Sequence, residues 1–205
     1  MLLYVTRHGK TLNNSTGRIS GIVDVPLSPE GVEEARGLAR KLCEGRNRYR
    51  ILHVVSSNLV RARQTAEIVA KALSLPVTVD SLFHEVSFGS DEGSLFSERP
   101  YQERKDEPFS RFTGGESLVD AACRVYPALD EMRKMYTGNV LLVTHGMLAR
   151  VIATYFHSYT IEQLKSSLMP NCSLACYDME QAERHPVPES EPFRGIAGVR
   201  SSLGV

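Results

Sequence analysis

The sequence carries no net charge and no long hydrophobic run. Its 205 residues include 24 lysines and arginines and 24 aspartates and glutamates. Because this balance offers no broad positive surface, we expect neither a nucleic acid nor a membrane surface as a partner. The longest apolar stretches, such as residues 140–143, are far shorter than the roughly 20 residues with which a helix crosses a bilayer. Any positive field must be local and made by a few placed arginines.

Cysteines are few and scattered along the chain, at Cys43, Cys123, Cys172 and Cys176. We interpret them as ordinary buried thiols of a reduced protein. The last two are four residues apart, but no second pair of Cys or His completes a zinc set, so no metal site is expected there. The N-terminus shows no basic leader or cleavage site before Arg7, and we predict a first strand there and not a signal peptide. Together these features predict a cytoplasmic protein.

The apolar pattern alternates between strand and helix along most of the chain. This alternation predicts an α/β fold, a three-layer α/β/α sandwich around a mainly parallel sheet. Strands are expected at 2–6, 51–56, 76–79, 139–144 and 172–178, and helices at 29–42, 59–73, 118–132 and 147–155. Pro127 is expected to kink the third helix. Residues 1–179 would form one catalytic domain, and residues 180–205, rich in proline and poor in large apolar side chains, a poorly ordered C-terminal extension.

The segment 82–115 breaks this regularity, because Gly, Ser, Pro and charged residues dominate it. We expect a partly helical excursion beside the functional site, of the kind that often carries specificity. Its basic residues could grip the distal charges of a ligand. Because they alternate with acids, a solvated helix face is the favoured interpretation. They are Arg99, Arg104, Lys105 and Arg111.

Two predicted strands end in nearly the same way, in Arg7-His8-Gly9 and in Thr144-His145-Gly146. Ligands of parallel α/β sheets bind beyond the carboxyl ends of the strands, so both histidines should emerge at one edge. Each following glycine would let the backbone turn sharply and let a ligand come close. A single histidine would be interpreted as a hydrogen-bonded structural residue, but the matched pair favours a functional site.

Arg61 falls in the first turn of the second predicted helix, off its apolar stripe. A cation is electrostatically misplaced at a helix N-terminus, so an anion is expected nearby. Arg63 fits a solvated surface position better. The guanidinium groups of Arg7 and Arg61, with the donors of His8 and His145, suit a doubly charged phosphoryl group. The residues by themselves therefore indicate phosphate chemistry.

Further motifs occur in order along residues 2–178, and together they resemble the histidine phosphatase superfamily in its phosphoglycerate-mutase-like branch. The motifs are Arg7-His8-Gly9-Lys10-Thr11, Asn14, Ser20-Gly21, Asp24-Val25-Pro26-Leu27-Ser28, Ser56-Ser57-Asn58-Leu59, Arg61-Ala62-Arg63-Gln64-Thr65-Ala66, Glu85, Glu92-Gly93, Gly114-Gly115-Glu116-Ser117 and Thr144-His145-Gly146 with Arg150.

The resemblance implies a role for each matching residue. His8 would accept the phosphoryl group, Arg7, Arg61 and His145 would cradle it, and Glu85 would give a proton to the leaving alkoxide. Asn14, Ser20 and Gly21 would contact the substrate, a small phosphorylated metabolite, without cofactor or metal. From the residues alone, Asp91 or Glu92 could equally be the acid, and we expect Glu92 to be structural. A homodimer remains an option.

Several positions depart from the mutase pattern. Mutases of this family usually carry arginine directly after the acid and Gly-Asn-Ser after the second histidine, where this chain has Val86 and Gly146-Met147-Leu148. The segment between Glu85 and Gly114 is also short. Each departure removes a polar substrate contact, so we predict a phosphatase that acts through phosphohistidine. The alternatives are a phosphoglycerate mutase, a non-catalytic phospholigand-binding protein, and a metal hydrolase that uses both histidines. Lys10 also replaces the usual acid, with a consequence that the sequence leaves open.

Overall fold

Hydrophobic side chains that alternate along the strands divide the core into two layers, one on each face of a single sheet. The computed structural model describes residues 1–181. Leu3 and Leu142 point into one apolar cluster, and their neighbours Tyr4 and Leu141 point into the other. A strand buried on both faces is typical of parallel sheets, because helices cover each side. The predicted three-layer α/β/α architecture is confirmed.

The sheet has five strands in the order β3-β2-β4-β1-β5. All pairs are parallel except β1 with β5, which is antiparallel. The sheet is therefore mainly parallel, as predicted. The strands are β1 (Leu2–Arg7), β2 (Ile51–Ser56), β3 (Val77–Val79), β4 (Asn139–Thr144) and β5 (Leu174–Asp178).

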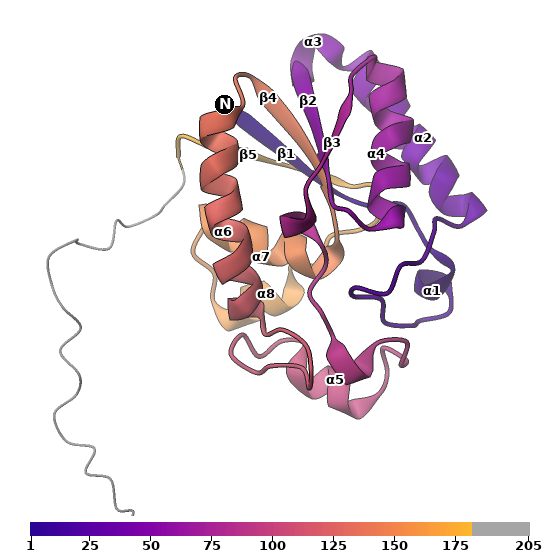
Figure 1. Ribbon diagram of the computed structural model, residues 1–205, viewed down its shortest axis with the longest axis vertical. Helices are drawn as coiled ribbons and strands as arrows, with labels where there is room; N and C mark the ends of the chain where they lie inside the picture. The colour runs from indigo at the N-terminus through magenta and orange to yellow at the C-terminus, as the bar shows by residue number, and fades with distance from the viewer. Residues whose placement is uncertain (182–205) are drawn as a thin grey trace, which may run out of the picture.

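Two pairs of long helices cover the sheet. One face carries α2 (Pro29–Glu44) and α4 (Val60–Leu73), which pack on each other, and the other carries α6 (Leu118–Met135) and α7 (Gly146–Phe156) (Figure 1). Ser28 caps α2 through its hydroxyl, with proline at the first helical position. The helix α6 continues through Pro127 to Met135.

Short helices that the periodicity did not predict fill the connections. They are α1 (Leu12–Ser15), α3 (Arg46–Tyr49) and α8 (Ile161–Ser166). The irregular segment 82–115 contains α5 (Arg99–Arg104) and two 3₁₀ turns, Ser81–Phe83 and Gly89–Asp91, so the partly helical excursion is confirmed. Elements of four to six residues carry too few apolar positions to show a period.

Two further expectations concern thiols and the C-terminus. None of the four cysteines is buried: Cys123 and Cys176 are exposed, and Cys43 and Cys172 are half-buried. The expectation of buried thiols was wrong, because these residues lie on helix flanks and on or beside the edge strand β5, where one side faces solvent. The predicted C-terminal extension, residues 180–205, lies outside the described residues except for its first two.

Candidate active site

The two histidines lie at the ends of neighbouring parallel strands, β1 and β4. Arg7 pairs with Thr144 in the register of these strands, and the His8 amide donates to the Thr144 carbonyl at 2.9 Å. The ring centroids of His8 and His145 are 5.2 Å apart. The prediction that both histidines emerge at one edge of the sheet is therefore confirmed.

The ring of His8 is held in one tautomer by its own backbone. Its Nδ1 lies 2.7 Å from the carbonyl oxygen of Gly9, which can only accept, so Nδ1 carries the hydrogen. The lone pair of Nε2 then accepts a hydrogen bond from Nε of Arg61 at 3.2 Å. His8 thus presents an unprotonated nitrogen toward the guanidinium that could hold an anion.

Both histidine rings favour the neutral form. Burial, followed by the nearby positive charges of Arg61 and Arg7, holds the pKa of His8 well below its usual value of 6.5. Burial and Arg61 also hold the pKa of His145 well below that value. A neutral imidazole is the nucleophilic form, so these surroundings favour the form in which His8 could attack an electrophile near pH 7.

Packing against protein atoms requires a glycine at Gly9 and leaves little room beside Gly146. A Cβ on Gly9 would lie 2.4 Å from the carbonyl oxygen of Gly31, a contact that backbone cannot relieve. A Cβ on Gly146 would lie 3.3 Å from the Arg7 guanidinium carbon. Neither residue is among the glycines with positive φ. Neither glycine is therefore needed for a left-handed backbone, and the close approach of Gly31 and Arg7 is the packing reason that the structure adds.

Arg61 is buried in the first turn of α4 and held by backbone carbonyls. Its Nη1 donates to Val23 O at 2.9 Å, and its Nη2 donates to Gly21 O at 2.6 Å and to Ser20 O at 3.2 Å. These bonds fix the guanidinium and leave its Nε to donate to His8. The expected anion is not a protein carboxylate, because Arg61 has no ion pair among the described side chains. Arg63 is exposed, as predicted.

Two buried donors beside His8 lack partners. Arg7 donates from Nη1 to Met169 O at 3.0 Å, but its Nε has none. His145 shares a 2.8 Å hydrogen bond between Nε2 and Ser57 Oγ, but its Nδ1 has none. Within residues 1–181 these are the two buried side-chain polar atoms without a hydrogen bond. Such groups are costly unless satisfied, so both atoms point to an external acceptor such as an anion.

Glu85 is fixed by backbone amides at the N-terminus of α7. Its Oε1 accepts from Leu148 N at 2.8 Å and from its neighbour Val86 at 2.9 Å, and its Oε2 accepts from Met147 N at 3.0 Å. The amides of Met147 and Leu148 are among those that a helix N-terminus leaves without intrahelical partners. The same helix start therefore follows His145 and positions the carboxyl group of Glu85.

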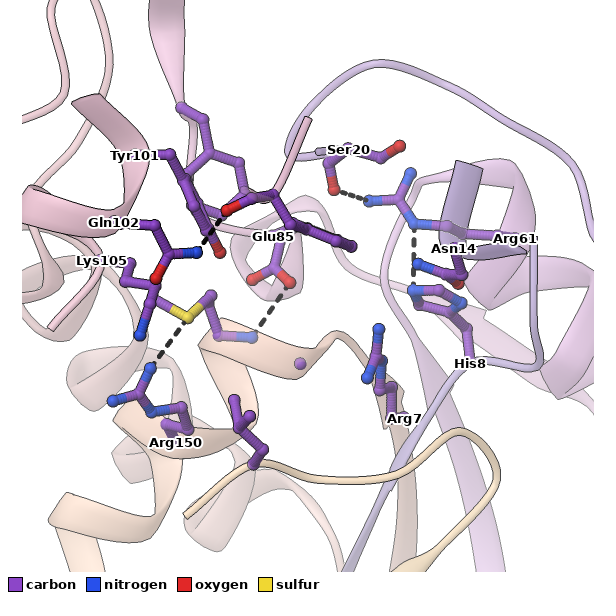
Figure 2. A pocket seen from close by; sticks show the side chains of 15 residues that line it. Arg7, His8, Asn14, Ser20, Arg61, Glu85, Tyr101, Gln102, Lys105 and Arg150 are labelled. Atoms are coloured by element: carbon purple, nitrogen blue, oxygen red, sulfur yellow. Dashed lines mark hydrogen bonds between the residues drawn. The ribbon is translucent and has the colours of Figure 1, made fainter. Parts of the chain in front are cut away.

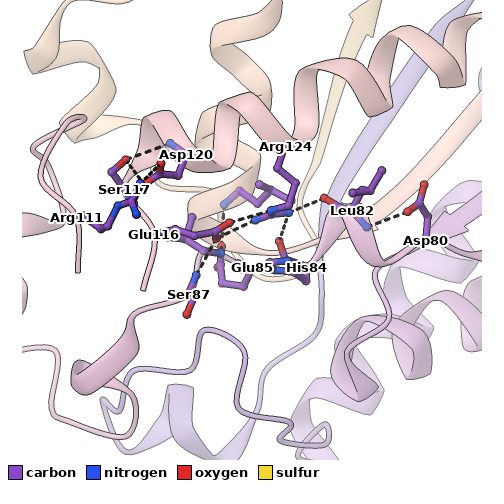
Figure 3. A network of polar contacts seen from close by, with 12 residues as sticks. Asp80, Leu82, His84, Glu85, Ser87, Arg111, Glu116, Ser117, Asp120 and Arg124 are labelled. Atoms are coloured by element: carbon purple, nitrogen blue, oxygen red, sulfur yellow. Dashed lines mark hydrogen bonds and ion pairs between the residues drawn. The ribbon is translucent and has the colours of Figure 1, made fainter. Parts of the chain in front are cut away.

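A polar network braces the backbone on both sides of Glu85 (Figure 3). Arg124 binds both oxygens of the Glu116 carboxylate at 3.0 Å and donates to the carbonyls of Leu82 and His84 at 2.5 and 3.3 Å. The Glu116 carboxylate in turn accepts from Ser87 N at 3.1 Å. Helix α6 thus fixes the short segment that carries Glu85.

These groups line one pocket of about 280 Å³ (Figure 2). It contains six of the eight residues predicted for the site: Arg7, His8, Asn14, Ser20, Arg61 and Glu85. The other two, Gly21 and His145, lie behind the lining. Gly21 faces Arg61 and Glu92, and His145 is fully buried beneath His8 and Ser57. Further lining comes from Phe88, Phe96, Tyr101, Gln102, Lys105, Gly146, Met147, Arg150 and Leu168.

The loop that carries Ser20 and Gly21 is held from below by Glu92. The Glu92 carboxylate accepts from the amides of Gly21, Ile22 and Phe88 at 2.9 to 3.1 Å. The structural role expected for Glu92 is confirmed. Asn14 caps α1, where its Oδ1 accepts from Thr11 N at 3.1 Å.

The excursion 82–115 supplies site residues that sequence reasoning missed. Arg99 and Arg111 are exposed and paired on the surface, as expected for a solvated face, but Lys105 lines the pocket. Tyr101 was also missed, although it lies four residues before Lys105 and therefore on the same side of the α5 turn. That spacing is a signal the sequence did contain.

Two kinds of feature are absent from residues 1–181. No group of three or more His, Cys, Asp or Glu side chains is placed to hold a metal ion. No helix in this range combines the length and the apolar character needed to span a membrane.

Known proteins share both the sequence and the fold. A family model described as the histidine phosphatase superfamily (branch 1) matches residues 3–187. The probable phosphoglycerate mutase GpmB of Yersinia pestis is 31% identical over 188 residues, which cover 88% of this chain and 86% of that protein. A mycobacterial glucosyl-3-phosphoglycerate phosphatase, solved as a complex with VO3, superposes with a TM-score of 0.78 at 26% identity. The superposition covers 88% of this chain and 94% of that one. The structure of a Thermus thermophilus protein, TTHB049, gives a TM-score of 0.67 at 29% identity, over 87% and 94% of the two chains.

Proposed function

Because the chain belongs to branch 1 of the histidine phosphatase superfamily, we propose that it hydrolyses a small phosphomonoester through a phosphohistidine intermediate on His8. The observation that carries the proposal is the arrangement of free donors. Nε of Arg7 and Nδ1 of His145 are both buried and unpartnered, and both residues neighbour His8, a neutral imidazole whose Nε2 is unprotonated. A phosphoryl group on Nε2 would accept from both, and Arg61 would supply a third donor from Nε.

In the first step, Nε2 of His8 forms a bond to phosphorus while the bond from phosphorus to the ester oxygen breaks. Phosphoryl transfer spreads negative charge over three oxygens, so the fixed donors of Arg7, Arg61 and His145 supply the main stabilisation. The ring becomes cationic, and its Nδ1–H donates to Gly9 O. Glu85, protonated in this step, gives its proton to the departing alkoxide.

In the second step, water attacks phosphorus and the N–P bond breaks. The Glu85 carboxylate accepts a proton from that water, inorganic phosphate leaves, and His8 recovers its neutral ring. Glu85 suits this double role because it lines the same pocket as His8 and is fixed by the start of α7. No step calls for a metal, so we expect the rate to be unchanged by a chelator.

Trapping of the intermediate tests the proposal. Acid-labile label from a radiolabelled aryl phosphate should bind to the wild type during turnover, be absent in His8→Ala, and persist in His145→Ala. His145→Ala would then be slow because it lacks one oxygen ligand. Labelling that is unchanged in His8→Ala would contradict the assignment of the nucleophile.

A phosphoglycerate mutase is the second candidate, favoured by the similarity to GpmB. An assay with 3-phosphoglycerate as substrate distinguishes a mutase from a phosphatase. Formation of 2-phosphoglycerate without release of phosphate supports the mutase, whereas release of phosphate supports the phosphatase. The pocket favours hydrolysis because Val86 is fully buried in the core and Met147 presents a thioether to the pocket, so neither offers a polar contact to a second anionic group.

A non-catalytic phospholigand-binding protein is the third candidate. It would bind phosphomonoesters without turnover over a broad substrate panel. The fixed position of Glu85 argues against it, because binding an anion needs no carboxylic acid in the same pocket.

A further inference from the structure

The cations of the pocket form two groups at opposite ends (Figure 2). Arg7 and Arg61 lie beside His8. Lys105 and Arg150 lie on the far side, and Glu85 lies between the two groups in this view. A phosphoryl group on His8 would therefore direct its leaving group toward Lys105 and Arg150.

The two groups differ in their ion pairs. Among the described residues, neither Arg7 nor Arg61 forms a salt bridge. At the far end, Asp106 pairs with both cations. Its Oδ1 lies 3.1 Å from Arg150 Nη2, and its Oδ2 contacts Lys105 Nζ. Asp106 does not line the pocket but stands behind the two cations.

The donors of Arg150 are occupied by the protein itself. Nε and Nη2 donate to Leu164 O at 3.1 and 2.7 Å, and Nη1 donates to the sulfur of Met147 at 3.1 Å. The side chain is 1% exposed, so it cannot turn to another partner without breaking these bonds. Partial burial alone would raise the pKa of Asp106, but its bonds to Lys105 and Arg150 lower it, so the aspartate stays charged near pH 7.

Between the two ends, part of the wall is aromatic, and Glu85 and Gln102 are polar members of it. Tyr101 packs edge-on against Phe88 at 5.6 Å between centroids, and Phe96 lies 5.8 Å from the Tyr101 ring. Burial and the nearby Glu85 raise the pKa of Tyr101, so it remains a neutral phenol. With Met147, these rings offer contact surface and no charge to a leaving group.

We propose that Asp106 sets the charge at the leaving-group end of the pocket: by pairing with both Lys105 and Arg150 it offsets one of their two positive charges. The substrate is then a small monoester whose alcohol or phenol carries at most one negative charge of its own. This assignment rests on the proposed phosphatase function and deepens it. The pocket of about 280 Å³ lies near the lower end of the range for ligand sites, roughly 300–1,000 Å³, which restricts the leaving group to about one ring.

Two substrates of equal size test the role of Asp106, 4-carbamoylphenyl phosphate and 4-carboxyphenyl phosphate. The ratio of kcat/KM for the two substrates in the wild type is the reference. In Asp106→Asn, Lys105 and Arg150 lose their shared negative partner. The ratio of kcat/KM for the carboxylate to kcat/KM for the amide should then rise by roughly tenfold, which is the size of one charge-assisted hydrogen bond. Because the ratio is compared between variants, the different reactivities of the two esters cancel.

Matched variants control for net charge and for folding. Glu107→Gln removes the neighbouring negative charge, which is exposed and 3.9 Å from Lys165, and should leave the ratio at its wild-type value. Lys105→Met leaves Asp106 with one cation and should move the ratio severalfold the other way, toward the amide. This variant keeps Arg150 paired and so tests the assignment even where Asp106→Asn does not fold.

The corresponding phosphonates separate failure of this assignment from failure of the proposed function. Their binding is measured by calorimetry and needs no turnover. If no variant hydrolyses the esters but the preference between the two phosphonates still changes in Asp106→Asn, the proposed phosphatase function is overturned and the role of Asp106 is retained. Hydrolysis with the same ratio in wild type, Asp106→Asn and Lys105→Met would overturn the assignment. An equal shift in Glu107→Gln would overturn it too.

Discussion

Ser57 Oγ lies 2.8 Å from Nε2 of His145, and both residues are fully buried. Ser57 Oγ also accepts from Leu59 N at 3.2 Å, so its own hydrogen is available to Nε2. With Nε2 accepting, the imidazole hydrogen is on Nδ1, the atom without a partner. With the Ser57 hydroxyl as donor to Nε2, His145 presents a donor at Nδ1.

Ser57→Ala should therefore lower kcat/KM by about tenfold, because the donor tautomer of His145 loses its support. Ser56→Ala is the matched control. Ser56, the last residue of β2, is equally buried, but its hydroxyl donates to Ser57 O at 2.9 Å and not to His145. Steady-state kinetics and thermal unfolding of both variants show whether the loss comes from the contact with His145 or from packing. Equal losses of activity in the two would show a general packing effect.

Glu85→Gln should slow hydrolysis according to the leaving group. An alkyl phosphate needs protonation of its alkoxide, so its rate should fall by about 10²- to 10⁴-fold. Hydrolysis of p-nitrophenyl phosphate should fall much less in its first step, because nitrophenolate leaves without a proton. Rapid-mixing measurements of phenol release isolate that step. An equal loss with both substrates would contradict the role of Glu85 as acid.

Protonation of the two buried histidines should couple stability to pH. Because their folded pKa values are depressed, the unfolded chain binds more protons once the pH falls below about 6.5. Their contribution is fully present above that pH and is lost as the pH falls through the folded pKa. Each histidine should add about 1.4 kcal/mol per pH unit to the slope of the unfolding free energy in this window.

Urea unfolding between pH 5.5 and 7.5 measures this slope. His8→Gln should reduce this slope by the contribution of one histidine, while the contribution of His145 remains. A slope unchanged by the substitution would show that His8 has an ordinary pKa in the folded protein. The same neutral state predicts that the acidic limb of kcat/KM lies below pH 6.5.

Arg124→Met should destabilise the protein and lower kcat, because the hydrogen bonds from Arg124 to Glu116 and to the backbone beside Glu85 are lost. We expect a loss of roughly 2 kcal/mol in unfolding free energy, since Glu116 is left without its partner in a half-buried position. Arg133→Met is the control on the same helix. Its partner Glu180 is exposed, so the loss should stay within about 0.5 kcal/mol. A kcat unaffected in Arg124→Met would remove the link between the brace and catalysis.

A feature of this protein could be predicted from the sequence when the residues that form it are close together along the chain. The long helices and the five strands follow from local patterns, because a residue such as Leu38 or Val69 reports its burial through its neighbours in sequence. The ends of β1 and β4 could be matched because parallel strands share an edge. The α5 segment carried no such period, and Lys105 was expected on a solvated face although it lines the pocket.

The sequence by itself determined the α/β architecture, the order of the motifs, and the meeting of His8 with His145 and Arg61 in one region. These follow from residue type and short-range spacing, whereas the choice of Glu85 over Asp91 and Glu92 followed from the family resemblance. Only the tertiary structure decided which atoms of these residues are free. The bond from Ser57 to His145, the carbonyls on Arg61 and the pairing of Asp106 with Arg150 join residues 38 to 88 positions apart. Such contacts leave no periodic signal, since they depend on where whole elements pack against one another.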